Sequence, residues 1–189
     1  MQYKILHKNL YYLNDYALIP YREEDLFKIR RWRNEQINIL RQKKPLTEKE
    51  QKKYFEEIVS PTFNQNKPPM MLFSFLKNEH CIGYGGLVYI DWEAGRAEVS
   101  FLLDPQRVRN SEQYKKDFSA FLTILKQIAF TKLKLNRLFT ETFDLRPFHI
   151  SVLEKNGFIL EGRMREHVKI KGRLVDSLIH AVLRSDYEA

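Results

Sequence analysis

The sequence predicts one domain of the α/β class, in which a mixed sheet carries helices on its faces. Its 189 residues suit a single domain, 1–189, built around one core. Apolar residues make up 43% of the chain and aromatic residues 13%, which is enough to fill that core. Strand-like runs alternate with segments of helical periodicity in the order β-α-α-β-β-β-α-β-α-β-β, an alternation typical of this class.

The N-terminal part of the chain predicts a strand followed by a helix. Residues 16–21 form an apolar run closed by Pro20, which is typical of a strand. The preceding residues, 1–15, are rich in Tyr, Leu and Ile, and we expect them to add a strand or a hairpin. Residues 23–25 are all acidic and belong in the first turn of a helix, where the helix dipole favours negative charge. This helix is expected to run to about Asn34.

Two further patterns predict a second helix and a hairpin. Thr47 and Glu50 have the spacing of a capping box, so a helix is expected to begin at Thr47 and to continue to Ile58. Residues 70–76 and 81–90 are apolar runs on either side of a short polar turn, which predicts two antiparallel strands.

The C-terminal half continues the alternation of strands and helices. Apolar residues recur at steps of three and four along one long predicted helix, at Tyr114, Phe118, Phe121, Leu122, Leu125, Ile128 and Ala129. The other predicted elements are strands at 97–103 and 138–143, a short helix at 147–156 ended by Gly157, and two antiparallel strands at 158–167 and 174–183.

Composition and charge exclude several classes of protein. The apolar runs fall far short of the ~20 residues that cross a bilayer, and the first residues lack the pattern of a secretory signal. The single cysteine, Cys81, is expected to be a buried thiol, and the protein is expected to be cytoplasmic. The net charge of +8 is spread along a chain that also carries acidic residues and shows no nucleic-acid-binding motif. We therefore expect small anionic ligands, and neither nucleic acid nor membrane as a partner.

Five segments of the C-terminal half form a series of motifs: Ala97–Pro105 (AEVSFLLDP), Leu135–Leu138 (LNRL), Val152–Phe158 (VLEKNGF), Glu161–His167 (EGRMREH) and Lys171–Leu178 (KGRLVDSL). In order and spacing this series resembles the GNAT acetyltransferases, especially the branch that contains the ribosomal-protein N-terminal acetyltransferases. Upstream, Trp32-Arg33-Asn34 is similar to GNAT enzymes that acetylate amino sugars on nucleotide carriers.

This resemblance implies the GNAT acyl-CoA N-acyltransferase fold, with a mixed sheet of about seven strands and about four helices. It implies acetyl-CoA as co-substrate and a small-molecule amine as acceptor, and it leaves a homodimer open. No metal is expected, because the histidines lack the spacing of metal ligands.

The resemblance also indicates where the coenzyme binds. The family holds the diphosphate with a loop of the form (Q/R)-x-x-G-x-(G/A) at the start of the long helix, which falls here on Gln113–Phe118. Gln113 matches, whereas Lys116 and Phe118 replace the small residues that let backbone approach a phosphate. Basic side chains nearby are expected to add charge-assisted contacts to phosphate. The expected coenzyme-binding residues are Leu102, Leu103, Arg107, Arg109, Gln113, Lys115, Lys116, Asp117, Phe118 and Arg146.

Acyl transfer to an amine needs a base, because alkyl ammonium groups titrate near ~10. Glu98 occupies the family's position for this base; the alternative is that it pairs with an arginine on the sheet face. The departing thiolate needs an acid. The family's tyrosine position holds Leu153 here, but His149 lies one turn earlier and titrates near ~6.5 when unperturbed. His149 is therefore the candidate acid; the alternative is a histidine that packs against the coenzyme or faces solvent.

The family layout places Trp32, Arg33 and Asn34 toward the acceptor, with Tyr89 and Trp92 as further aromatic residues for stacking. The alternative is that Trp32 is a core residue and Arg33 a solvated helix end. Three functions stay open. The positive charge favours N-acetylation of a nucleotide-linked amino sugar, the C-terminal motifs equally support acetylation of a protein N-terminus, and the missing glycines favour a GNAT-like binding module without catalysis.

Overall fold

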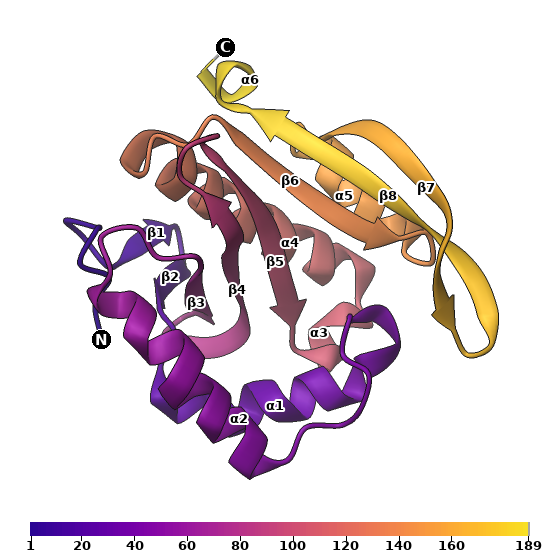
Figure 1. Ribbon diagram of the computed structural model, residues 1–189, viewed down its shortest axis with the longest axis horizontal. Helices are drawn as coiled ribbons and strands as arrows, with labels where there is room; N and C mark the ends of the chain where they lie inside the picture. The colour runs from indigo at the N-terminus through magenta and orange to yellow at the C-terminus, as the bar shows by residue number, and fades with distance from the viewer. Residues whose placement is uncertain (189) are drawn as a thin grey trace.

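The chain forms one mixed sheet with helices packed on it (Figure 1), as shown by a computed structural model that describes residues 1–188. The sheet has eight strands in the order β1-β2-β3-β4-β5-β6-β8-β7, and only β5 and β6 pair in parallel. The expected fold class is confirmed, with an eighth strand because β1 forms a hairpin with β2. The strands are β1 (Tyr11–Leu13), β2 (Tyr16–Pro20), β3 (Met71–Lys77), β4 (His80–Asp91), β5 (Arg96–Leu103), β6 (Arg137–Phe143), β7 (Ile159–Ile170) and β8 (Arg173–Leu183).

Helices lie on both sides of the sheet. In Figure 1, α4 and α5 lie behind it, while α1 and α2 cross its lower edge. Within residues 1–188, no helix combines the length and the apolar character needed to span a bilayer. The α-helices are α1 (Leu26–Glu35), α2 (Glu48–Tyr54), α3 (Pro105–Val108), α4 (Ser111–Lys126), α5 (Pro147–Lys155) and α6 (Arg184–Glu188). Single turns of 3₁₀- or π-helix occupy Glu23–Asp25, Ile37–Ile39, Phe55–Val59, Ser60–Asn64 and Gln127–Lys132.

Two helix ends follow directly from local sequence. The capping box at the start of α2 is confirmed: Thr47 Oγ1 accepts from the Glu50 backbone N–H, and the Glu50 carboxylate accepts from the Thr47 N–H. α5 ends before Gly157, whose φ of +87° lies in the left-handed region that favours glycine.

Aromatic rings from the sheet and from α4 meet in the core. Phe101 of β5 stacks on Phe118 with ring centroids 4.3 Å apart, and Phe121 lies against both Phe101 and Phe75. Cys81 is buried, and burial raises the pKa of its thiol to about 12, which agrees with the expected structural role.

The sheet opens between β5 and β6. These strands pair only from Arg96 to Glu98 on β5, opposite Arg137 to Phe139 on β6. Beyond this point β5 continues along β4, and β6 continues along β8. The two strands therefore diverge, and a cavity begins where they separate.

Candidate active site

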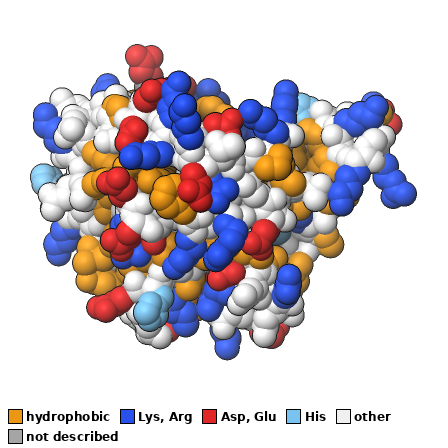
Figure 2. Space-filling view, turned by 90° about the horizontal axis from the view of Figure 1, so that it is seen from below, with side chains coloured by type: hydrophobic (Ala, Val, Ile, Leu, Met, Phe, Trp, Pro, Cys, Tyr) orange, Lys and Arg blue, Asp and Glu red, His pale blue; other side chains and the backbone are white. Residues whose placement is uncertain are grey.

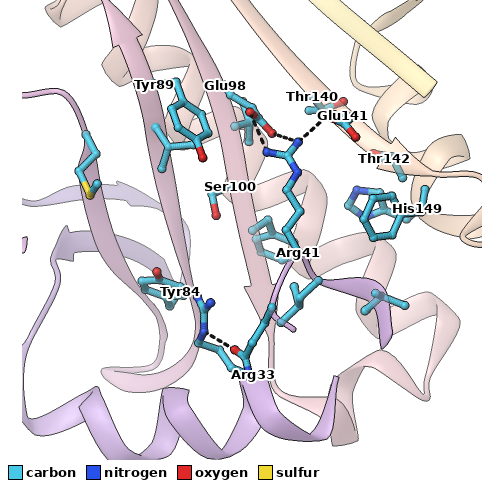
Figure 3. A pocket seen from close by; sticks show the side chains of 18 of the residues that line it. Arg33, Arg41, Tyr84, Tyr89, Glu98, Ser100, Thr140, Glu141, Thr142 and His149 are labelled. Atoms are coloured by element: carbon cyan, nitrogen blue, oxygen red, sulfur yellow. Dashed lines mark hydrogen bonds and ion pairs between the residues drawn. The ribbon is translucent and has the colours of Figure 1, made fainter. Parts of the chain in front are cut away.

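A cavity of about 560 Å³ occupies the opening between β5 and β6 (Figure 3). Its walls come from β4, β5, β6, the start of α5 and the segment between α1 and α2, which we call the α1–α2 segment (residues 36–47). The volume falls in the range of pockets that hold small ligands. The charged and titratable residues of its walls are Arg33, Arg41, Tyr54, Tyr84, Tyr89, Glu98, Glu141, Arg146 and His149.

One edge of β5 faces this cavity with unpaired backbone. A Cβ atom added to Gly85 of β4 would collide with the carbonyl oxygen of Ser100, so the Ser100 peptide points toward β4. Successive peptide groups along a strand point in opposite directions, so those of Val99 and Phe101 point toward the open edge. Both residues line the cavity. Their N–H and C=O groups are suited to bind the amides and the carbonyl of an extended ligand.

The two leucines expected at the coenzyme differ in their backbone directions. Leu102 repeats the orientation of Ser100, because its carbonyl oxygen lies toward Gly83 of β4. Leu103 lies on the open edge, where its carbonyl accepts a hydrogen bond of 2.8 Å from the Gln36 side chain. Both leucine side chains are buried in the core.

Glu98 is held by an arginine of the α1–α2 segment. Arg41 donates to Glu98 Oε1 at 2.7 Å and to Oε2 at 3.2 Å, and it also donates to Glu141 Oε2 at 2.9 Å (Figure 3). Glu98 is the last residue of β5 that pairs with β6, and Glu141 lies on β6 just past the divergence. The structure therefore places Glu98 at the cavity, as expected, and identifies Arg41 as the arginine with which it pairs.

His149 is buried beside Tyr114 and Arg146. Its Nδ1 lies 2.5 Å from the Tyr114 hydroxyl, to which Arg146 donates at 3.3 Å. Burial, then the positive charge of Arg146 and the neighbouring His180, hold the pKa of His149 well below its ordinary 6.5. Burial raises the pKa of Tyr114 to about 12, so this hydroxyl keeps its proton and donates it to Nδ1. The neutral imidazole then carries its own proton on Nε2.

This environment corrects one expectation about His149. An acid that titrates near ~6.5 is not present, because the charged form is disfavoured by burial. What His149 offers at the cavity wall is a neutral ring with a defined N–H donor.

The expected phosphate loop is helical. A short helix, α3, follows β5, and α4 begins at Ser111 with its Gln113 N–H accepted by the Asn110 side chain. Gln113–Phe118 therefore lies inside α4 and exposes no glycine backbone. Phe118 is buried and stacks on the His149 ring with centroids 4.5 Å apart. This agrees with the long predicted helix, which already included Tyr114 and Phe118, and α4 begins two residues before Gln113.

Three of the expected coenzyme residues form a buried polar cluster instead. Asp117 is completely buried and accepts from Arg107 at 2.6 and 3.0 Å, from Gln113 at 2.7 Å and from the Tyr16 hydroxyl at 2.9 Å. We call these four residues the Asp117 cluster. Its bonds fix the start of α4 to β2, and they occupy side chains that were expected at phosphate. Of the other expected cations, Arg146 lines the cavity. Arg109, Lys115 and Lys116 lie outside its walls, where Arg109 and Lys116 are exposed and Lys115 is half-buried.

The five residues expected at the acceptor divide between the cavity and its surroundings. Arg33 and Tyr89 line the cavity, Arg33 bonded to Gln42 at 3.1 Å and Tyr89 exposed at the end of β4. Trp32 is 3% exposed and belongs to the core, as its alternative interpretation had it. Asn34 instead holds the α1–α2 segment through two hydrogen bonds with the Leu46 backbone. Trp92 donates to the Pro68 carbonyl at 2.9 Å.

Five titratable or charged residues at or near the cavity escaped the sequence analysis as site residues: Arg41, Tyr54, Tyr84, Tyr114 and Glu141. The helical spacing of Tyr114 predicted a core residue, and Tyr114 is buried. The spacing did not reveal that its hydroxyl contacts His149. Arg41 lies in a loop without periodicity, and its partners are 57 and 100 residues away. No local pattern could have connected them.

Charges of both signs are interspersed over the surface. In Figure 2 basic and acidic side chains alternate over the face shown, with basic ones toward the end where the β7–β8 hairpin projects. Among residues 1–188, no group of three or more His, Cys, Asp or Glu is arranged to hold a metal ion.

Comparisons with known proteins identify the domain family of the chain and proteins of similar fold. Residues 19–179 match the model of the acetyltransferase (GNAT) domain. Over 112 residues the chain is 33% identical to "Uncharacterized N-acetyltransferase p20" of Bacillus licheniformis, covering 59% of this chain and 60% of that protein's length. The fold is similar to spermidine N-acetyltransferase from Vibrio cholerae in complex with CoA and spermine (TM-score 0.80, 18% identity, covering 94% of this chain and 100% of that one). A dodecameric structure of that enzyme in an intermediate state has a TM-score of 0.75 at 21% identity, covering 93% and 97%.

Proposed function

Because the chain belongs to the GNAT acetyltransferase domain family, we propose that it transfers the acetyl group of acetyl-CoA to a primary amine bound in the cavity between β5 and β6. The observation that carries this proposal is the joint position of Glu98 and of the open edge of β5 at one cavity. A base for the amine and backbone donors for the carbonyl oxygen are among the groups that acyl transfer to an amine needs from a protein.

The cavity suits the thioester half of the co-substrate. Pantetheine amides find partners in the Val99 and Phe101 peptides, and either N–H is placed to stabilise the carbonyl oxygen as it gains charge. The diphosphate half finds no glycine loop. We assign its first contact to Arg146, which lines the cavity at the start of α5 and bonds only weakly to a neutral hydroxyl. Arg109, Lys115 and Lys116 lie near the start of α4, where side chains rather than backbone reach a phosphate.

Glu98 and His149 divide the proton chemistry in this proposal. Glu98 takes a proton from the acceptor's ammonium group, so that the nitrogen lone pair can form the new C–N bond. As the C–S bond breaks, the Nε2–H of neutral His149 donates a hydrogen bond to the sulfur. Tyr114 keeps this N–H in place by donating to Nδ1. The thiolate then takes its proton from water or from the new amide nitrogen.

For the acceptor, we favour a nucleotide-linked amino sugar. Glu98 and Glu141 are suited to hold its ammonium group, while Arg33, bonded only to a neutral amide, is free to pair with a phosphate. The Tyr54, Tyr84 and Tyr89 rings in the cavity provide surfaces for a base or a sugar. The two carboxylates also favour a second candidate, a polyamine, the class on which the structural neighbours are named to act. Acetylation of a protein N-terminus, a homodimer and the ribosomal-protein branch remain predictions.

A thiol-release assay with acetyl-CoA compares these acceptors directly. We expect turnover with UDP-linked amino sugars, and at least about tenfold lower kcat/KM with spermidine and with N-terminal peptides, which lack a phosphate for Arg33. The matched control is the same sugar nucleotide with its amine already acetylated, which should give none.

Other outcomes of the same assay assign the function differently. Faster turnover of spermidine would move the acceptor to the polyamines. Release of thiol with none of the three classes would support a binding module without catalysis.

A further inference from the structure

Arg41 makes a contact that the catalytic scheme cannot keep. Both oxygens of Glu98 accept from its guanidinium, at 2.7 and 3.2 Å. These two hydrogen bonds take the place from which an acceptor's ammonium group would donate to the Glu98 carboxylate. In the arrangement described here an acceptor therefore cannot reach Glu98 unless Arg41 withdraws.

The Arg41 guanidinium occupies a place that would suit a cationic ligand. It sits between two carboxylates, Glu98 and Glu141, that come from the diverging strands and are only 11% and 18% exposed as side chains. Two carboxylates facing one small space repel each other unless a cation lies between them. Arg41, itself 44% exposed, reaches that space from the α1–α2 segment. One cation thus fills the space between the Glu98 and Glu141 carboxylates, which opens directly onto the cavity and which we call the seat.

The backbone of the α1–α2 segment is held on both sides of Arg41, and Gln42 is bonded to Arg33 and Asn34, whereas the Arg41 guanidinium is free of the core. At one end Gln36 donates to the Leu103 carbonyl, and at the other Asn34 exchanges two hydrogen bonds with the Leu46 backbone, at 2.8 and 2.9 Å. Arg41 lies between these anchors, with its head attached only through Glu98 and Glu141. Its withdrawal breaks ion pairs at a partly exposed place and leaves the core intact.

We propose that Arg41 is an internal competitor of the acceptor: its guanidinium occupies the seat between Glu98 and Glu141 in which the acceptor's ammonium group binds. This inference rests on the proposed function and specifies how the acceptor is recognised. An acceptor binds by displacing Arg41, which at the same time frees Glu98 to take the proton. The seat accepts a single compact cation. An amine binds only to molecules from which Arg41 has withdrawn, so its apparent affinity falls as the fraction of molecules with Arg41 in place rises.

Kinetics of Arg41→Ala test this competition. We expect the KM for the amine to fall about tenfold, with kcat and the KM for acetyl-CoA changed by less than about twofold. Arg31→Ala is the matched control, because Arg31 is an exposed arginine on α1 whose ion-pair partner, Glu35, lies outside the cavity. Arg31→Ala removes the same charge and should change none of these three kinetic constants. A loss of kcat in Arg41→Ala, or an unchanged or higher KM for the amine, would show that Arg41 orients Glu98 and would overturn the proposal.

A binding measurement tests the seat without turnover. Methylguanidinium has the head group of arginine, so calorimetry should detect its binding to Arg41→Ala, at least about tenfold more tightly than to the wild type or Arg31→Ala. Adding Glu98→Gln to Arg41→Ala should abolish this gain. Equal binding to all variants would overturn the proposal. If no chain releases thiol with any amine, the proposed function fails, and this measurement still decides whether the seat binds cations.

Discussion

Replacing Glu98 by Gln is expected to lower kcat about 100-fold at neutral pH, because an amide cannot take the proton that the attacking ammonium must lose. The size follows from what a positioned base contributes to proton transfer, and this loss of kcat should come in addition to weaker binding of the amine. The affinity for acetyl-CoA should not change, since the Glu98 side chain pairs with Arg41 on the acceptor side. Thiol-release kinetics over pH 6–9 check both statements.

Glu141→Gln is the control for this experiment, because Glu141 binds the same guanidinium but is not assigned the proton. We expect it to raise the KM for the amine severalfold and to leave kcat largely intact. Turnover of Glu98→Gln equal to the wild type would reject Glu98 as the base. Equal losses of kcat in both variants would show that the two carboxylates act as one unit.

Replacing Asp117 by Asn is expected to lower the free energy of unfolding by about 3 kcal/mol, because it leaves Arg107 and the other donors of the Asp117 cluster without a buried anion. Asn keeps the shape of the side chain but loses the charge and one acceptor, so packing changes little. For a chain of this size the loss corresponds to a fall in Tm of about 6–12 °C. Thermal and urea denaturation measure it.

An exposed network of ion pairs serves as the control for the cluster. Arg163 binds Asp144 at 2.6 Å and Asp176 at 2.7 Å, yet all three side chains are partly exposed. Arg163→Gln should therefore destabilise the protein far less than Asp117→Asn does. If Asp117→Asn is no more destabilising than Arg163→Gln, the Asp117 cluster does not fix the start of α4.

The elements that the sequence predicted well are those whose signals are local. Thr47 and Glu50 bond to each other within one turn, and Gly157 ends α5 through its own backbone conformation. The hairpin of β3 and β4 and the pairing of β7 with β8 follow from strand-like runs on either side of short turns. These features need no knowledge of the distant chain.

The exact start of α4, a few residues before Tyr114, could also have been predicted from local chemistry. Asn110 followed three residues later by Gln113 has the spacing of a helix N-cap, and the Asn110 side chain accepts from the Gln113 N–H. This signal places Gln113–Phe118 inside a helix. Trp32 is a similar case, because Leu26, Ile29 and Trp32 share one buried face by helical spacing.

The rest of the site depends on contacts that no local pattern reports. The pKa of His149 is lowered by burial and by Arg146, and its Nδ1 partner, Tyr114, lies 35 residues away. Arg41 meets Glu98 and Glu141 only because the α1–α2 segment crosses the mouth of the cavity. Tertiary packing sets both the protonation of the histidine and the availability of the base.

The claim that the cavity between β5 and β6 holds acetyl-CoA without a glycine loop is tested most directly by calorimetric titration of the wild-type protein with acetyl-CoA. The account predicts a Kd in the micromolar range, and an Arg146→Gln variant that binds at least about tenfold more weakly, since a charge-assisted phosphate contact is lost. No heat of binding at millimolar acetyl-CoA would contradict it. The Phe118 and His149 rings would then close the cavity to the coenzyme.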